Sequence, residues 1–208
     1  MKTAFSILTV NRQIISFLLL LFIVVCASSC KSKSQHKQWD NASIDPTITQ
    51  STSFKLLNQE SEVFSGLEKE DTLAKRTSGV LYFTNGHINL SDSNSARLNN
   101  CRAYFFHGET LSINIGIGNG FGGWGFIINY RDKKFYAEPY YSTDVIIVGE
   151  PEPVYEILYQ KLTLDKPSYK VGDSLFGKID FKTIEIDQDK TKIEHSGKGY
   201  FRSKVSVL

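Results

Sequence analysis

From residue 79 to the C-terminus the chain repeats one pattern, in which short runs rich in aromatic and β-branched residues alternate with turn sequences. Such runs favour β-strands, because aromatic and branched side chains pack well on a pleated, half-buried surface. No stretch of helical periodicity interrupts the series. The pattern therefore predicts an all-β domain over residues 79–208, either an antiparallel β-sandwich or a partly closed barrel.

Turn sequences define where the expected strands begin and end. The Asn85-Gly86 pair and the polar segments 107–109 and 131–134 each predict a hairpin connection. The expected strands cover residues 80–84, 87–91, 102–106, 110–117, 124–130, 135–139, 145–148, 155–164, 174–185, 191–195 and 200–207.

One stretch of the β region resembles a known fold family. Residues 162–181 read LTLDKPSYKVGDSLFGKIDF. This is similar to the strand–turn–strand of exported immunoglobulin-like domains, where a Tyr, a Gly-Asp pair and a second Gly set the turn. The resemblance implies a sandwich, and it implies no activity.

The first 29 residues have the composition of an export signal. Lys2 and Arg12 are their charged residues, and Ile14–Val25 is an apolar run of 12 residues interrupted by Ser16. A membrane-spanning helix needs about 20 apolar residues, so the run fits the core of a signal peptide better than a span. Small residues then precede Cys30.

The sequence Ala27-Ser28-Ser29-Cys30 resembles the lipobox of bacterial lipoprotein precursors, with Ala27 where Leu is commonest. The resemblance implies a diacylglycerol on the Cys30 thiol and cleavage between Ser29 and Cys30. It also implies an anchor in the cell envelope, and Lys31 and Ser32 after the cysteine favour the outer membrane of a Gram-negative bacterium. An ordinary secretory signal and an uncleaved anchor are the alternatives.

Two segments separate the leader from the β domain. Residues 30–53 are rich in Ser, Thr, Gln, Asn and Lys, and this composition predicts a flexible tether. Residues 54–78 form a lead-in, in which Phe54, Leu57, Phe64 and Leu67 fall near helical spacing. We expect one short amphipathic helix there, with its apolar stripe packed on the domain.

The charge of the mature chain excludes one class of partner. The whole chain has 24 basic and 22 acidic residues, but Lys2 and Arg12 belong to the leader. A chain that begins at Cys30 is therefore formally neutral. Nucleic-acid-binding proteins need a basic patch, so no nucleic acid is expected as a partner.

The glycine-rich stretch around residue 120 invites a nucleotide-binding interpretation. Residues 118–123 fit G-x-G-x-x-G, but that motif binds a dinucleotide only when a helix follows it. Here a predicted strand follows, so we interpret the glycines as a hairpin connection and expect no nucleotide. Trp124, Tyr140 and Tyr141 are a candidate aromatic platform for a sugar or another flat ligand.

The remaining chemically active residues suggest no catalytic site. The four histidines lack the spacing of metal ligands, and His87 and His107 are expected beside turns. Cys101 has no partner cysteine in the mature domain and is expected to be a small buried residue. Glu150 and Glu152 lie in a Pro-flanked segment that we interpret as a solvated loop. The sequence predicts no cofactor, no metal and no catalytic residue.

Taken with the lipobox, these observations favour a lipid-anchored envelope lipoprotein with a non-enzymatic binding or structural domain. Its expected partners are the membrane, through the lipid, and an envelope protein or glycan. Two alternatives are a periplasmic inhibitor or immunity-type lipoprotein and a hydrolase of envelope or other polysaccharides. A cleft that holds two or more of His87, His107 and His195 beside acidic residues would favour the hydrolase.

Overall fold

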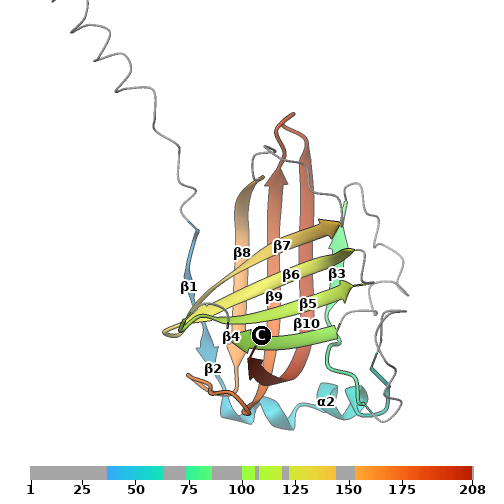
Figure 1. The fold of residues 1–208 in the computed structure, drawn as a ribbon, viewed down its shortest axis with the longest axis vertical. Helices are drawn as coiled ribbons and strands as arrows, with labels where there is room; N and C mark the ends of the chain where they lie inside the picture. The colour runs from blue at the N-terminus through green and yellow to red at the C-terminus, as the bar shows by residue number, and fades with distance from the viewer. Residues whose placement is uncertain are drawn as a thin grey trace, which may run out of the picture. The chain divides into compact units, whose positions relative to one another are not determined.

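The computed structural model describes residues 37–62, 74–85, 100–105, 108–118, 122–143 and 153–207, which all belong to one unit running from residue 37 to residue 208. These ranges are mostly β-strand (Figure 1). The longer strands are β3 (Leu81–Thr84), β4 (Asn100–Phe105), β5 (Leu111–Gly118), β6 (Gly122–Arg131), β7 (Lys134–Thr143), β8 (Val154–Leu164), β9 (Ser174–Ile186) and β10 (Lys192–Val207). The leader with Ser29 and Cys30, the expected strands 87–91 and 145–148, and Glu150 and Glu152 lie outside the described residues.

Most of the strand predictions that fall on described residues are confirmed. The hairpins β4–β5 and β6–β7 form as expected, with antiparallel register. One prediction is wrong, because the two expected strands 191–195 and 200–207 are a single strand, β10. A Cβ atom on Gly197 would collide with the ring of Phe181, so this glycine allows a close approach inside the strand instead of ending it.

The strands form one open sheet that folds into two layers. Its order is β1-β7-β6-β5-β4-β10-β9-β8-β2, and β3 pairs with β10 beside this path. Figure 1 shows β4–β7 crossing β8–β10 steeply, which is the orthogonal form of sandwich packing. Strand β10 joins the layers, because it pairs with β9 along most of its length and its last residues, 205–207, pair in parallel with β4. The predicted all-β sandwich is confirmed.

The core lies between these two layers and follows the alternation of the strands. In β9 every second residue from Leu175 to Thr183 is buried, and the residues between them face outward. Phe126 in β6 packs against Phe181 in β9, with ring centroids 4.7 Å apart. Burying an aromatic or aliphatic side chain of this size contributes about 1.5–3 kcal/mol, so these contacts account for much of the stability.

The N-terminal part of the domain begins earlier than the sequence predicts. Two short strands, β1 (Asp40–Asn41) and β2 (Ser43–Ile44), are followed by the 3-10 helix η1 (Pro46–Gln50) and the helix α2 (Thr52–Leu57). The prediction of a flexible tether as far as residue 53 is therefore wrong for residues 40–53, which form these elements. The prediction rests on polar composition, whereas residues 40–44 pair with two strand edges and Ile48 packs with Phe54 and Leu57.

The expected helix is present but short. It covers six residues, and Phe54 and Leu57 on one face pack with Ile48 against Phe176 and Tyr200. Residues 74–78 of the lead-in are not helical, and Phe64 and Leu67 lie outside the described residues. Within the described ranges, none of the helices is long and apolar enough to cross a membrane.

The N-terminal segment also closes the gap between β7 and β8, which we call the seam. Strand β1 pairs antiparallel with β7, and β2, one residue later in the chain, pairs in parallel with β8. The side chain of Gln160 in β8 completes the closure. Its Oε1 accepts the N–H of Ala137 at 3.0 Å, and its Nε2 donates to the carbonyl of Gln38 and to Asp40 Oδ2.

Candidate functional site

The structure divides the predicted aromatic platform between two surfaces. Trp124 lies directly opposite Tyr141 in the β6–β7 ladder, so these two side chains share a face. Trp124 packs against the edge of the core, whereas Tyr141 is 64 % exposed. Tyr140 lies opposite Gly125 and points to the other face of the sheet. A ligand on the Trp124 side would therefore contact Tyr141 and not Tyr140.

Tyr140 has a structural role beside two glycines of the glycine-rich stretch. Gly116 and Gly125 face one another across β5 and β6, and a Cβ on Gly116 would collide with the Tyr140 hydroxyl and with the Trp124 carbonyl. The ring thus covers two residues that have no side chain. Burial raises the pKa of Tyr140, although a hydrogen bond from Asn114 acts in the opposite direction. The strand predicted after the glycines is β6.

A chain of three polar side chains lies at one end of the core. The Tyr82 hydroxyl is 2.8 Å from His195 Nδ1, and His195 Nε2 is 2.8 Å from Glu185 Oε2. Tyr82 and His195 are buried, and the Glu185 side chain is 21 % exposed. These residues come from β3, β10 and β9, at positions where each strand faces inward.

The hydrogen bonds define the tautomer of His195. An ionised carboxylate only accepts hydrogen bonds, so Nε2 must carry the proton that is donated to Glu185. In a neutral imidazole Nδ1 is then the acceptor, and the Tyr82 hydroxyl is the donor. Burial and the nearby Glu185 charge raise the pKa of Tyr82, which keeps this hydroxyl protonated.

This polar chain resembles a catalytic relay in its connections but not in its access to solvent. Tyr82 is 2 % exposed, and its ring packs beside Phe126 and Phe181. A nucleophile must reach its substrate, so the arrangement is better suited to fixing strand register through satisfied buried hydrogen bonds. His36, His87 and His107 lie outside the described residues, so the cleft expected for a hydrolase is not assembled from the part that is described.

Sequence reasoning missed this polar chain, although a signal was present. In β9 and β10 the residues at every second position are buried, and this alternation places Glu185 and His195 on the core-facing side. Two titratable groups at inward positions of neighbouring strands need hydrogen-bond partners. Applying the strand period to the polar residues as well as to the apolar ones would have identified the pair.

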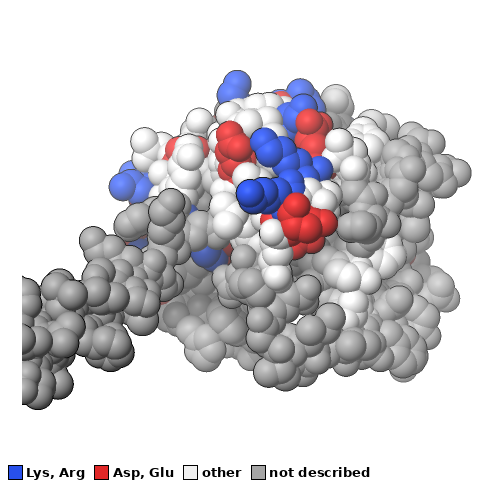
Figure 2. All heavy atoms as spheres, turned by 90° about the horizontal axis from the view of Figure 1, so that it is seen from above, with Lys and Arg blue, Asp and Glu red and all other residues white. Residues whose placement is uncertain are grey.

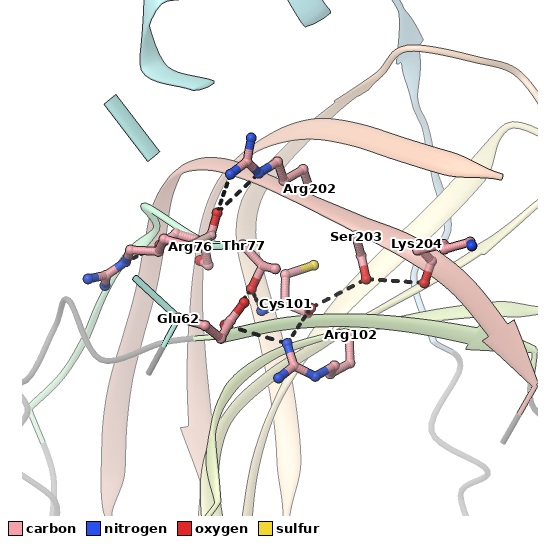
Figure 3. A network of polar contacts seen from close by, with 9 residues as sticks. Glu62, Arg76, Thr77, Cys101, Arg102, Arg202, Ser203 and Lys204 are labelled. Carbon is pink, nitrogen blue, oxygen red and sulfur yellow. Dashed lines mark hydrogen bonds and ion pairs between the residues drawn. The ribbon is translucent and has the colours of Figure 1, made fainter. Parts of the chain in front are cut away.

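A second buried network surrounds Cys101, as Figure 3 shows. The thiol is fully buried, which confirms the expectation for this residue, and burial raises its pKa well above the usual range. The Cys101 N–H donates to Thr77 Oγ1 at 2.8 Å, and Thr77 Oγ1 donates to Glu62 Oε1 at 2.8 Å. Burial also raises the pKa of Glu62, against the opposing effects of Thr77 and Arg102.

Two arginines extend this network to the sheet (Figure 3). Arg202 in β10 donates from Nε and Nη2 to the carbonyl of Arg76. Arg76, whose side chain is 9 % exposed, donates in turn to the Ser78 carbonyl and to Glu60. These contacts attach the segments 58–62 and 74–78 to the β-strands, so the network has a structural role.

The outward face of β9 and β10 carries charges of both signs. Lys198 pairs with Asp180 at 2.8 Å, and Lys182 pairs with Glu194 at 2.9 Å. Figure 2, which views the molecule from above, shows basic and acidic groups interleaved. A surface with alternating signs has little long-range attraction for a polyanion.

Comparison with protein-family models, with curated proteins and with solved structures found no match in any of the three searches.

Proposed function

We propose that the chain is a lipoprotein of the cell envelope, anchored through lipid on Cys30, with a β domain that binds a partner and catalyses no reaction. The observation that carries the proposal is the apolar run of 12 residues followed by Ala27-Ser28-Ser29-Cys30. The expected partner is an envelope protein or a glycan, and the expected location is the outer membrane of a Gram-negative bacterium.

The positions of the two most reactive side chains described support binding over catalysis. Because the pKa of Cys101 is raised by burial, its thiol is neutral near pH 7, and a neutral thiol is a poor nucleophile. His195 is hydrogen-bonded at both ring nitrogens, to Tyr82 and Glu185. A general base needs a ring nitrogen that faces its substrate.

The anchor is tested by the mass of the mature N-terminus after expression in a Gram-negative host. We expect the N-terminal peptide of the wild-type protein to begin at Cys30 and to carry the diacylglycerol mass. The Cys30→Ser variant should lack it. Cys26→Ser is the matched control, because that residue leaves with the leader and its loss should change nothing. A wild-type chain cut elsewhere and without lipid would contradict the proposal.

The binding role is tested by crosslinking the native lipoprotein in membranes and recovering it with its partners. We expect reproducible recovery of one envelope protein or glycan. Tyr141→Ala should reduce recovery if the exposed face beside Trp124 makes the contact. Tyr159→Ala, which removes a tyrosine of β8 that is 43 % exposed, is the control. Turnover of a polymer by the purified protein would contradict a non-enzymatic role.

A further inference from the structure

The first residues of the folded unit run along β7 toward the turn between β6 and β7. Lys37 Nζ donates to Glu138 at 2.9 Å, and the Trp39 ring lies edge-on to Tyr136 with centroids 4.6 Å apart. The Ala42 N–H then donates to the Lys133 carbonyl at 2.8 Å. The described chain therefore begins beside Glu138 and reaches the turn at Ala42.

The β6–β7 turn is basic and has an unfavourable backbone for its side chains. It reads Arg131-Asp132-Lys133-Lys134, and the φ angles of Asp132 and Lys133 are 52° and 62°. Two consecutive residues with positive φ form the tight hairpin turn that normally contains Asn or Gly. A lysine at the second position keeps a positive charge where glycine would be less strained.

The charges of this turn are available to a partner. Lys133 and Lys134 are exposed, and among the described residues neither has a carboxylate within ion-pair distance. Arg131 makes a loose 3.8 Å contact with Asp132, and both of these side chains are more than half exposed. The Arg131 guanidinium also lies 5.7 Å from the centre of the partly exposed Trp39 ring. The turn thus places Arg131 beside an aromatic ring and leaves two further basic side chains exposed.

Covalent geometry limits how far this region can lie from a lipid on Cys30. Seven peptide units separate Cys30 from Lys37, and a fully extended chain of that length spans about 25 Å. This limit is set by the chain length alone. The anchor would therefore hold the Trp39 region within reach of the lipid headgroups.

We infer that Trp39, Arg131, Lys133 and Lys134 form a docking edge for the surface of an anionic phospholipid membrane. The inference rests on the proposed lipid anchor at Cys30. Basic side chains near a membrane are attracted to anionic headgroups, and tryptophan favours the interface between headgroups and acyl chains. Trp124 lies seven residues before Arg131 in β6, about 23 Å along the strand from that residue, and would lie farther from the membrane than Trp39.

Trp39 and Trp124 are the two tryptophans of the chain, and they allow a direct test in the lipidated protein. The Trp124→Phe variant reports Trp39, and the Trp39→Phe variant reports Trp124. Each is reconstituted in phosphatidylglycerol-containing vesicles whose lipids carry a shallow bromine quencher. We expect Trp39 to be quenched strongly and Trp124 weakly. If the two tryptophans are quenched equally, or if neither is quenched in the anchored protein, the docking edge is wrong. Neither result would contradict the lipid anchor.

A vesicle sedimentation assay tests the basic side chains of the docking edge in a protein that lacks the lipid anchor. The mature chain from residue 30 with Cys30→Ser should bind phosphatidylglycerol-containing vesicles and not pure phosphatidylcholine vesicles, and high salt should weaken the binding. Lys133→Gln with Lys134→Gln should reduce the affinity roughly 25-fold, about fivefold for each charge. Lys190→Gln with Lys192→Gln removes the same charge at the β9–β10 connection and should leave binding unchanged.

A glycine variant separates binding from stability. Lys133→Gly should weaken vesicle binding about fivefold, because one charge is lost. Its thermal stability should be unchanged or higher, because glycine adopts positive φ without strain. If both lysine pairs weaken binding equally, or if Lys133→Gly binds as well as the wild type, the docking edge is wrong.

Discussion

The β9–β10 ladder and the seam between β7 and β8 join strands by different means. The ladder has continuous backbone pairing, from Ser174 opposite Lys204 to Ile186 opposite Lys192. The seam relies on two strands of two residues each and on the amide of Gln160. Backbone pairing does not depend on which side chain is present, so the ladder should tolerate changes on its outer face. The seam depends on a particular side chain.

Pro139 in β7 is consistent with this difference. Proline has no N–H to donate, so within sheets it is found at edges and bulges. Here it lies on the side of β7 that faces the seam, where the Tyr155 hydroxyl contacts its carbonyl at 3.5 Å. Side chains of β8 thus contact β7 where regular strand pairing is lacking.

The largest expected effect is on the inner face of the ladder. Phe181→Ala should lower the free energy of unfolding by about 3–5 kcal/mol, because it removes a ring that is 1 % exposed and leaves a cavity beside Phe126. Urea denaturation measures this loss. Lys182→Ala, the next residue on the outer face, should change stability by less than about 0.5 kcal/mol. Similar losses for the two variants would show that the ladder does not derive its strength from the core.

A smaller decrease in the free energy of unfolding is expected when a glycine of the ladder gains a methyl group. Gly197→Ala should cost about 1–3 kcal/mol, because the added Cβ would collide with Phe181. The three atoms nearest to the added Cβ all belong to that ring, so Phe181→Leu should relieve part of the loss. A double-mutant cycle measures this coupling. Simple additivity of the two changes would contradict the proposed close approach.

At the seam, Gln160→Leu keeps the size of the side chain and removes its hydrogen bonds. The free energy of unfolding should fall by about 1–3 kcal/mol, toward the lower end of that range, because the buried Ala137 N–H is left without an acceptor. Hydrogen exchange should accelerate at Ala137 and at Ala42, whose N–H donates to the Lys133 carbonyl, and remain slow in β9. Lys161→Leu, which changes an exposed neighbour, is the control. Uniform acceleration across both layers would mean that the seam is not a separate unit.

The smallest effect concerns an ion pair on the outer face of the ladder. The Lys198 ammonium lowers the pKa of Asp180, so the ionised form favours the folded state. This stabilisation is present above the ordinary pKa of 3.8 and is lost as the pH falls through the lowered value. Asp180→Asn should therefore be slightly less stable than the wild type at pH 7 and equal to it in strong acid. A difference that persists in acid would exclude the ion pair as its cause.

The sequence predicts the structure correctly where local hydrophobic pattern and turn residues determine it. Strands β4 to β9 follow their hydrophobic patterns and turn residues, and Cys101 is buried as its surroundings suggest. The short strands at residues 40–44 could not be predicted, because they are stabilised by strand edges far away in sequence. The candidate platform groups Tyr140 with Trp124 and Tyr141, but adjacent residues of a strand point to opposite faces, so Tyr140 lies on the other side of the sheet.

The seam also determines when the domain can be completed. Gln160 bonds to Asp40 across 120 residues of sequence, and a contact of that range forms late because its loop is long. Under the proposed export and lipid anchor, residues 40–44 would emerge early, before either strand edge is in place. Their pairing, and with it the last step of folding, would then follow the arrival of β8 and would take place beside the membrane.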